Sequence, residues 1–185
     1  PYSFILNKEY LSLLSVDGAK ETSLELNSLS KSHNMAGWRI GMVAGHREYI
    51  SNILKVKSNM DSGMFRALQS AAVEALGNPP SWYDTVNSVY EKRRIIVEEI
   101  MNILKCSYDK NQSGLFLWGR IPDSIGNCEQ FVDEILNNTH VFITPGFIFG
   151  SMGDRYIRIS LCADEKALLE AKRRISSPKS PLQGK

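Results

Sequence analysis

The chain has 185 residues, of which 43% are hydrophobic and 23% are charged, and its formal net charge is +2. These values are typical of a globular protein and leave room for one large or two small domains with an apolar core. The near-neutral charge argues against a nucleic-acid partner, and no apolar stretch approaches the length of a membrane span. The three cysteines and three histidines are scattered without metal-ligand spacing, so we predict no metal site and a reducing, cytoplasmic location.

The first 80 residues combine short apolar runs with helical patterns. Alternating or continuous apolar residues predict strands, whereas apolar residues three and four positions apart predict helices. The predicted strands are 1–6, 21–30 and 38–45, and the predicted helices are 46–60 and 63–80. In helix 46–60, Tyr49, Ile50, Ile53 and Leu54 lie at helical spacing. The abrupt start on PYSFIL, without an initiator Met, is typical of the middle of a longer protein.

Residues 81–175 have the pattern of a compact α/β unit. Ser81 is expected to cap a long amphipathic helix that ends near Lys105 and buries an apolar stripe that includes Val89. Further strands are predicted over 114–121, 140–146 and 155–162, and further helices over 127–139 and 163–175, the last capped by Asp164. The polar, proline-containing tail 176–185 is predicted to be disordered.

The stretch SLSKSHNMAGWRIG, residues 28–41, places Lys31 among serines and Arg39 eight residues later. A neutral lysine amine forms an imine with an aldehyde, and small neighbouring side chains let a bulky cofactor approach. The guanidinium fork of Arg39 and the hydroxyl of Ser28 suit a phosphate dianion. One lysine, one serine and one arginine are therefore what a phosphorylated aldehyde cofactor requires.

This stretch resembles the lysine motif of the class I and II aminotransferases, which are fold-type I enzymes that use pyridoxal 5'-phosphate. The shared pattern is S-x-S-K, five residues, then G-x-R-x-G. The resemblance implies that Lys31 carries the cofactor as a Schiff base and that Ser28 and Arg39 bind its phosphate. It also implies that Tyr2 contacts the pyridoxal 3'-oxygen, while the aspartate that precedes this tyrosine in the family lies upstream of Pro1.

A second resemblance lies near the other end of the chain. ITPGFIFGSMGDRYIRISLC, residues 143–162, is similar to the family's P-G-x-x-F-G segment and to the strand that follows it. The matching arginine is Arg158, which would bind the substrate carboxylate through two parallel hydrogen bonds. Its neighbours Ile157 and Ile159 are expected to face the other side of the strand.

The resemblance implies an α/β fold in which residues 1–80 are the end of the large, cofactor-binding domain, with its mixed sheet and helices. Residues 81–175 would be the small α/β C-terminal domain, followed by the tail 176–185. The implied function is that of the C-terminal portion of an aminotransferase, which moves an amino group between an amino acid and a 2-oxo acid. The implied assembly is a homodimer, and the isolated fragment is expected to be inactive.

Three alternatives remain open. A pyridoxal phosphate lyase or synthase of the same fold uses the same lysine, and a sensor domain of a transcription regulator binds the cofactor without turnover. A structural α/β domain without a cofactor requires the distant matches to be coincidental.

Met35 and Trp38 are expected to lie in the core, and His33 is expected to have a packing or solvent role.

Overall fold

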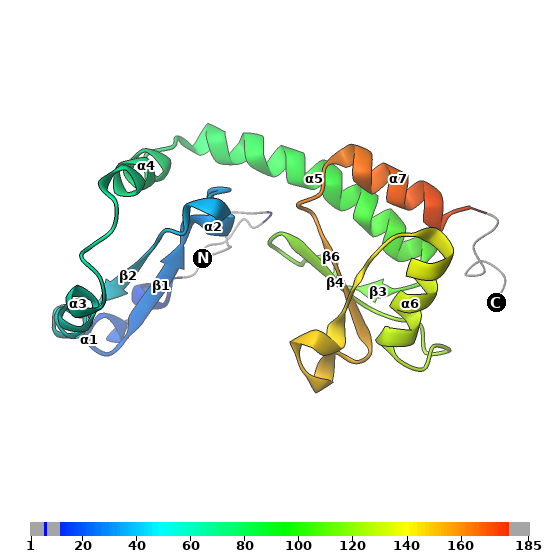
Figure 1. The fold of residues 1–185 in the computed structure, drawn as a ribbon, viewed down its shortest axis with the longest axis horizontal. Coiled ribbons are helices and arrows are strands. Elements are labelled where there is room, and N and C mark those ends of the chain that lie inside the picture. Colours follow the sequence, from blue (N-terminus) through cyan, green and yellow to red (C-terminus); the bar gives the residue numbers. More distant parts are fainter. Residues whose placement is uncertain (1–5, 7–11, 178–185) are drawn as a thin grey trace. The chain divides into compact units, whose positions relative to one another are not determined.

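The computed structural model describes Leu6 and residues 12–177. The chain divides into two compact units, residues 1–85 and residues 86–185 (Figure 1). The strand predicted over residues 1–6 lies outside the described residues except for Leu6, and the tail predicted over 176–185 is described only as far as Ser177.

The first unit contains a two-stranded antiparallel sheet, in which β1 (Leu24–Ser28) pairs with β2 (Gly41–Gly45). Its helices are α1 (Ala19–Thr22), α2 (Leu29–Ser32), α3 (Arg47–Met60) and α4 (Arg66–Leu76), and its 3-10 turns are η1 (Leu13–Ser15) and η2 (Ala36–Trp38). The strand predicted from residue 38 begins later, at Gly41, because Arg39 has a left-handed backbone with a φ of 51°. The strand predicted over 21–30 is shortened at both ends by α1 and α2.

The core of the first unit joins the segment around Lys31 to helix α4. Leu29, Met35 and Ile40 are buried and pack with Ala72 of α4. Alanines on this face of α4 bring the helix close to that segment. The prediction that Met35 lies in the core is confirmed. The prediction for Trp38 is wrong, because its side chain is 47% exposed.

Helix α3 forms as predicted, but it buries no apolar face in the part of the chain that the structure describes. None of its residues is buried, and Leu54 and Met60 are more than half exposed. Met42 and Val43 of the neighbouring strand are also exposed, and as adjacent strand residues they point to opposite faces of the sheet. The first unit therefore has apolar surface on both faces of a sheet that is small for independent stability.

The second unit is a four-stranded antiparallel sheet packed against helices, with the strand order β3-β4-β6-β5. Its strands are β3 (Ser107–Tyr108), β4 (Phe116–Arg120), β5 (Thr144–Pro145) and β6 (Tyr156–Ser160), and its helices are α6 (Cys128–Thr139), α7 (Glu165–Ile175) and most of α5 (Pro80–Ile103). Leu117 and Ile157 are buried on the face that packs on the helices. An alanine Cβ at Gly119 would lie 2.8 Å from the sulfur of Met101, so β4 lies directly against α5.

Helix α4 is shorter than its prediction of 63–80, whereas the ends of α5, α6 and α7 hold within two residues, with one exception among the predicted caps. Asn127 caps α6 by accepting a hydrogen bond from the Gln130 amide, and Asp164 caps α7, as predicted, by accepting one from the Ala167 amide at 2.7 Å. The exception is Ser81, because α5 already begins at Pro80, whose fixed φ suits the first helical position.

The buried stripe of α5 differs from the prediction at several positions, and Met101 is one of those that are buried without having been predicted. Val89 is 37% exposed, whereas Arg94 is buried. The Arg94 guanidinium pairs with Glu98 at 2.8 Å and donates to the carbonyls of Lys110 and Gln112. These hydrogen bonds satisfy a charge that would otherwise be costly to bury, and they attach α5 to the turn that precedes β4.

Two glycines hold the segment between β5 and β6 in a tight fold. Strand β5 is shorter than the prediction of 140–146, and after Pro145 the chain enters the 3-10 turns η3 (Gly146–Phe149) and η4 (Ser151–Gly153). An alanine Cβ at Gly153 would lie 2.0 Å from the carbonyl oxygen of Gly146. Because that neighbour is backbone, it cannot move aside as a flexible side chain would.

We expect Gly153→Ala to lower the free energy of unfolding by about 2 kcal/mol or more, since the added methyl group overlaps backbone atoms. Urea denaturation measures this change. The matched control is Gly126→Ala, whose Cβ would meet only the flexible Gln130 side chain, at 3.4 Å. Equal stability of the two variants would contradict the tight approach.

Candidate cofactor and substrate site

Lys31 lies on a one-turn helix that follows directly from β1. Ser28 caps this helix, since its Oγ accepts a hydrogen bond from the Ser30 amide at 3.2 Å. The buried hydroxyl of Ser32 donates to the Ser28 carbonyl at 3.1 Å. The backbone around Lys31 is thus held by side-chain hydrogen bonds from the serines on both sides of it.

The backbone hydrogen bonds of the sheet bring Arg39 next to this turn. The Leu29 amide donates to the Ile40 carbonyl at 3.2 Å, and Ser28 is the register partner of Gly41. The approach requires glycine at position 41, because a Cβ there would lie 2.7 Å from the Asn27 carbonyl oxygen. Ser28, Lys31 and Arg39 therefore lie on two adjoining segments of the first unit.

The three polar groups at this place have few partners among the described residues. Lys31 is partly exposed, and no hydrogen bond or ion pair of its amine involves a described residue. Arg39 is exposed and donates one hydrogen bond, from Nη1 to the Ala36 carbonyl at 3.0 Å. The Ser28 hydroxyl accepts a hydrogen bond but donates none within this part of the chain. A lysine, a hydroxyl and a guanidinium without an anionic partner fit a phosphorylated aldehyde.

Arg158 lies on β6 of the second unit, in contact with two aromatic rings. Its Cζ is 4.2 Å from the ring centroids of both Phe116 and Phe149. Such cation–π contacts stabilise a guanidinium without using its N–H groups. No described residue forms a hydrogen bond or an ion pair with this side chain. Its donors are thus available to a carboxylate.

The face of the sheet that carries Arg158 is lined by further aromatic side chains. Trp118 is the register partner of Arg158, so the two point to the same face. The Trp118 ring stacks on Tyr156 at 5.5 Å and meets Phe149 edge-on at 5.6 Å. Ile157 is fully buried on the opposite face, as predicted for this neighbour. The sequence alone does not place Phe116 and Trp118 beside Arg158, because the register between β4 and β6 cannot be read from one strand.

His33 is more highly structured than the sequence suggests. Its ring is buried, and Nδ1 lies 2.8 Å from Ser32 Oγ while Nε2 lies 3.0 Å from the Tyr83 hydroxyl. Burial lowers the pKa of His33, which favours a neutral ring. Of the two roles predicted for His33, packing or solvent exposure, the structure supports packing, and specific hydrogen bonds accompany it.

The remaining predicted site residue, Tyr2, lies outside the described residues. The structure brings Ser28, Lys31 and Arg39 together in the first unit and places Arg158 in the second. The surroundings of the predicted cofactor-binding residues and those of Arg158 are therefore each described within a single unit.

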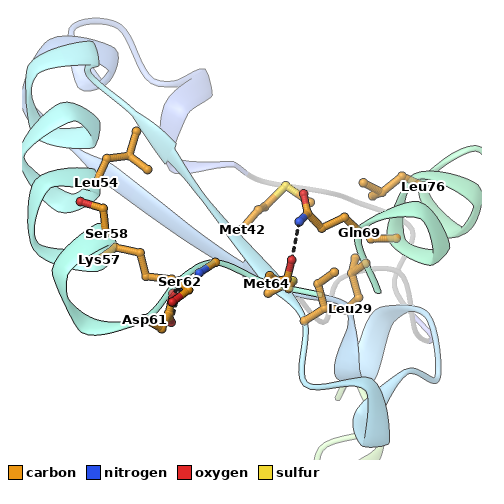
Figure 2. Close-up of a pocket in the computed structure, with 14 residues that line it drawn as sticks. Leu29, Met42, Leu54, Lys57, Ser58, Asp61, Ser62, Met64, Gln69 and Leu76 are labelled. Atoms are coloured by element: carbon orange, nitrogen blue, oxygen red, sulfur yellow. Dashed lines mark hydrogen bonds and ion pairs between the residues drawn. The ribbon is translucent and has the colours of Figure 1, made fainter. Parts of the chain in front are cut away.

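A cavity of about 640 Å³ lies elsewhere in the first unit (Figure 2). Leu29, Met42 and Leu76 line its apolar wall, and the ion pair between Lys57 and Asp61 lies at its edge. Of the predicted cofactor-binding residues that the structure describes, Ser28, Lys31 and Arg39, none lines the cavity. It is therefore apolar space between α3, α4 and the sheet and not the place where a phosphate would bind.

Other kinds of site find no support in the described residues. Within Leu6 and residues 12–177, no three His, Cys, Asp or Glu side chains are grouped to hold a metal ion, and no helix there is long and apolar enough to cross a membrane. All three cysteines are free. Burial raises the pKa of Cys106 to about 12, so this thiol is a poor nucleophile at neutral pH.

Comparison with known proteins gives a consistent result. The family model for aminotransferase class I and II matches residues 4–175. LL-diaminopimelate aminotransferase from Nitratidesulfovibrio vulgaris is 37% identical over 171 residues, which are 92% of this chain and 44% of that protein. The corresponding enzyme from Aquifex aeolicus is 38% identical over 91% of this chain and 43% of its own length. This chain thus spans less than half the length of these curated relatives.

Solved structures agree with this assignment. Apo-BacF from Bacillus subtilis superimposes with a TM-score of 0.83 at 33% identity, covering 94% of this chain and 45% of that one. A probable N-succinyldiaminopimelate aminotransferase from Thermus thermophilus gives 0.84 at 32% identity, covering 95% and 47%. The predicted fold, part of a mixed α/β transferase domain followed by a small α/β unit, agrees with these neighbours. The chain belongs to the class I and II aminotransferase family.

Proposed function

We propose that this chain is the C-terminal portion of a pyridoxal phosphate-dependent aminotransferase that transfers an amino group between an amino acid and a 2-oxo acid. The observation that carries the proposal is the serine-flanked turn of Lys31, whose backbone is hydrogen-bonded to the segment that follows Arg39, with no described side chain paired to the lysine amine. Family membership supports the reaction class. The span of less than half of the relatives' length supports the view that other parts of the enzyme lie outside this chain.

The residues present fit the cofactor. Lys31 would hold its aldehyde carbon through Nζ, while Ser28 and Arg39 would bind its phosphate by hydrogen bonds and charge. Tyr2 would contact the ring oxygen. When bound, pyridoxal phosphate supplies an aldehyde and a ring that accepts the electron pair left when the α-proton is removed.

The chain's own side chains would then orient the substrate and move the proton. Arg158 donates two parallel hydrogen bonds to the substrate carboxylate, which fixes the direction of the bonds at the α-carbon. As a neutral amine, Lys31 Nζ accepts the α-proton as general base and later returns a proton as general acid. Phe116 and Phe149 keep the Arg158 guanidinium in position through their ring faces.

The substrate class is an amino acid donor and a 2-oxo acid acceptor, without a commitment to one side chain. The names of the relatives support the reaction but differ in substrate, since they include LL-diaminopimelate, N-succinyldiaminopimelate and aromatic aminotransferases. A cytoplasmic homodimer is part of the proposal. The isolated 185 residues are expected to be inactive, and the exposed apolar side chains of α3 and β2 support this expectation.

The proposal is tested by chemical labelling of the chain extended by the upstream half that its relatives have. Pyridoxal phosphate is added, the mixture is reduced with borohydride, and the modified peptide is located by mass. We expect the label on Lys31 and its loss when an amino acid is added before reduction. The matched variants are Lys31→Ala, which should lose the label, and Lys20→Ala, an exposed lysine whose removal should leave it unchanged.

The same experiment separates the alternatives. A label on Lys31 that no amino acid displaces would favour a sensor domain. A displaced label with release of ammonia or of a cyclised product, in place of a 2-oxo acid, would favour a lyase or synthase. A label on other lysines only would overturn the proposal.

A further inference from the structure

We propose that His33 is a positioning residue for Lys31. It attaches the helical turn that contains Lys31 to the first turn of helix α5. This inference rests on the proposed function. The basis is a chain of hydrogen bonds that links two segments 50 residues apart in the sequence. It runs from the Ser28 carbonyl through Ser32 and the His33 ring to the Tyr83 hydroxyl.

The directions of these hydrogen bonds follow from the number of protons available. The Ser32 hydroxyl has one proton, and it is donated to the Ser28 carbonyl at 3.1 Å. Ser32 Oγ must therefore accept from His33, which places a proton on Nδ1. In a neutral ring Nε2 then carries a lone pair, and it accepts from the Tyr83 hydroxyl at 3.0 Å. A neutral histidine, with one donor and one acceptor, matches both partners.

Packing restrains the same ring. Its plane stacks on Trp82 with a centroid distance of 5.8 Å and an interplanar angle of 19°, and it meets the Tyr83 ring edge-on at 5.7 Å. Ser32 and His33 are 1% and 6% exposed. Movement of the turn would therefore break buried hydrogen bonds as well as ring contacts, which is costly.

The consequence for Lys31 comes from its place in the chain. Lys31 precedes Ser32 directly and belongs to the same four-residue helix. That helix is too short to hold its own geometry, because nucleation of an isolated turn is unfavourable. The contacts of Ser32 and His33 supply the missing restraint, and they leave the lysine side chain itself without a described partner.

The test uses the extended protein loaded with pyridoxal phosphate and two variants. His33→Phe keeps a ring of similar size and removes the hydrogen bonds to Ser32 and Tyr83, whereas Tyr83→Phe removes the hydroxyl that bonds to His33 and leaves the lysine segment unchanged. We expect kcat to fall about tenfold to a hundredfold in His33→Phe and by less in Tyr83→Phe. KM should change by less than about threefold, because the substitutions displace the lysine and leave the binding of the substrate unaltered. The absorbance spectrum of the bound cofactor should change in both.

The matched control is Tyr108→Phe, which removes a tyrosine hydrogen bond to Asn102 in the second unit. It should leave kcat and the cofactor spectrum unchanged. If His33→Phe and Tyr83→Phe lower only the melting temperature and otherwise resemble Tyr108→Phe, the positioning role is wrong while the proposed function stands. If the unaltered protein is not labelled on Lys31, both fall together. Should His33→Phe fail to fold, Tyr83→Phe decides the question alone.

Discussion

Lys31→Ala in the extended protein is expected to lower kcat by at least about 10³-fold. The substitution removes both the amine that would hold the cofactor and the base that would move the α-proton, and general acid–base catalysis alone contributes about 10²–10⁴-fold. Steady-state formation of the 2-oxo acid measures the loss. The fold should be intact, because Lys31 is partly exposed and no described residue pairs with it.

Two further variants separate chemistry from charge. Lys31→Arg keeps a positive charge but provides no neutral amine, so it should be as inactive as the alanine variant. Lys20→Ala removes an exposed lysine of α1 and should keep full activity. Substantial turnover in Lys31→Arg would mean that the residue acts through its charge alone, and the assignment of a covalent role would be wrong.

Much of the fold was predictable because it depends on local patterns. The spacing of apolar residues located helices α3, α4, α6 and α7, and the Asp164 cap was readable from its position before an apolar run. The lysine turn was recognisable because serine, lysine, glycine and arginine occur in it at fixed spacing. These features involve residues a few positions apart, so the sequence itself contains the information.

The features that could not be predicted depend on contacts between distant residues. The left-handed backbone of Arg39 delays the start of the predicted strand to Gly41, and nothing in its side chain indicates it. The hydrogen bond from Tyr83 to His33 joins positions 50 residues apart. The aromatic contacts of Arg158 follow from the register between β4 and β6, which a single strand does not specify.

Apolar periodicity does not by itself indicate burial, as helix α3 shows. The pattern correctly predicted a helix, but Leu54 and Met60 are exposed in this chain. A helical pattern reports which side chains can be buried together and not which element covers them. This chain spans less than half of its relatives' length, so apolar side chains at helical spacing need not be covered by another element of the same chain.

Arg158→Ala is expected to lower kcat/KM for amino acid substrates by about 10²–10³-fold. Removing one partner of a buried, charge-assisted pair costs about 2–5 kcal/mol. Both the amino acid and the 2-oxo acid have a carboxylate next to the reacting carbon, so KM should rise for both. Arg158→Lys should recover only part of the loss, because an ammonium group cannot form the two parallel hydrogen bonds of a guanidinium.

The decisive comparison is between an amino acid and the amine that lacks its carboxylate. If Arg158 binds the carboxylate, Arg158→Ala should lower kcat/KM for the amino acid and leave the value for the amine nearly unchanged, so that the preference between them collapses. The control is Arg120→Lys, an exposed arginine on β4 that pairs with Asp123 and should keep the preference. Equal losses for both substrates would show that Arg158 supports the fold of its sheet, through Phe116 and Phe149, and does not recognise the carboxylate.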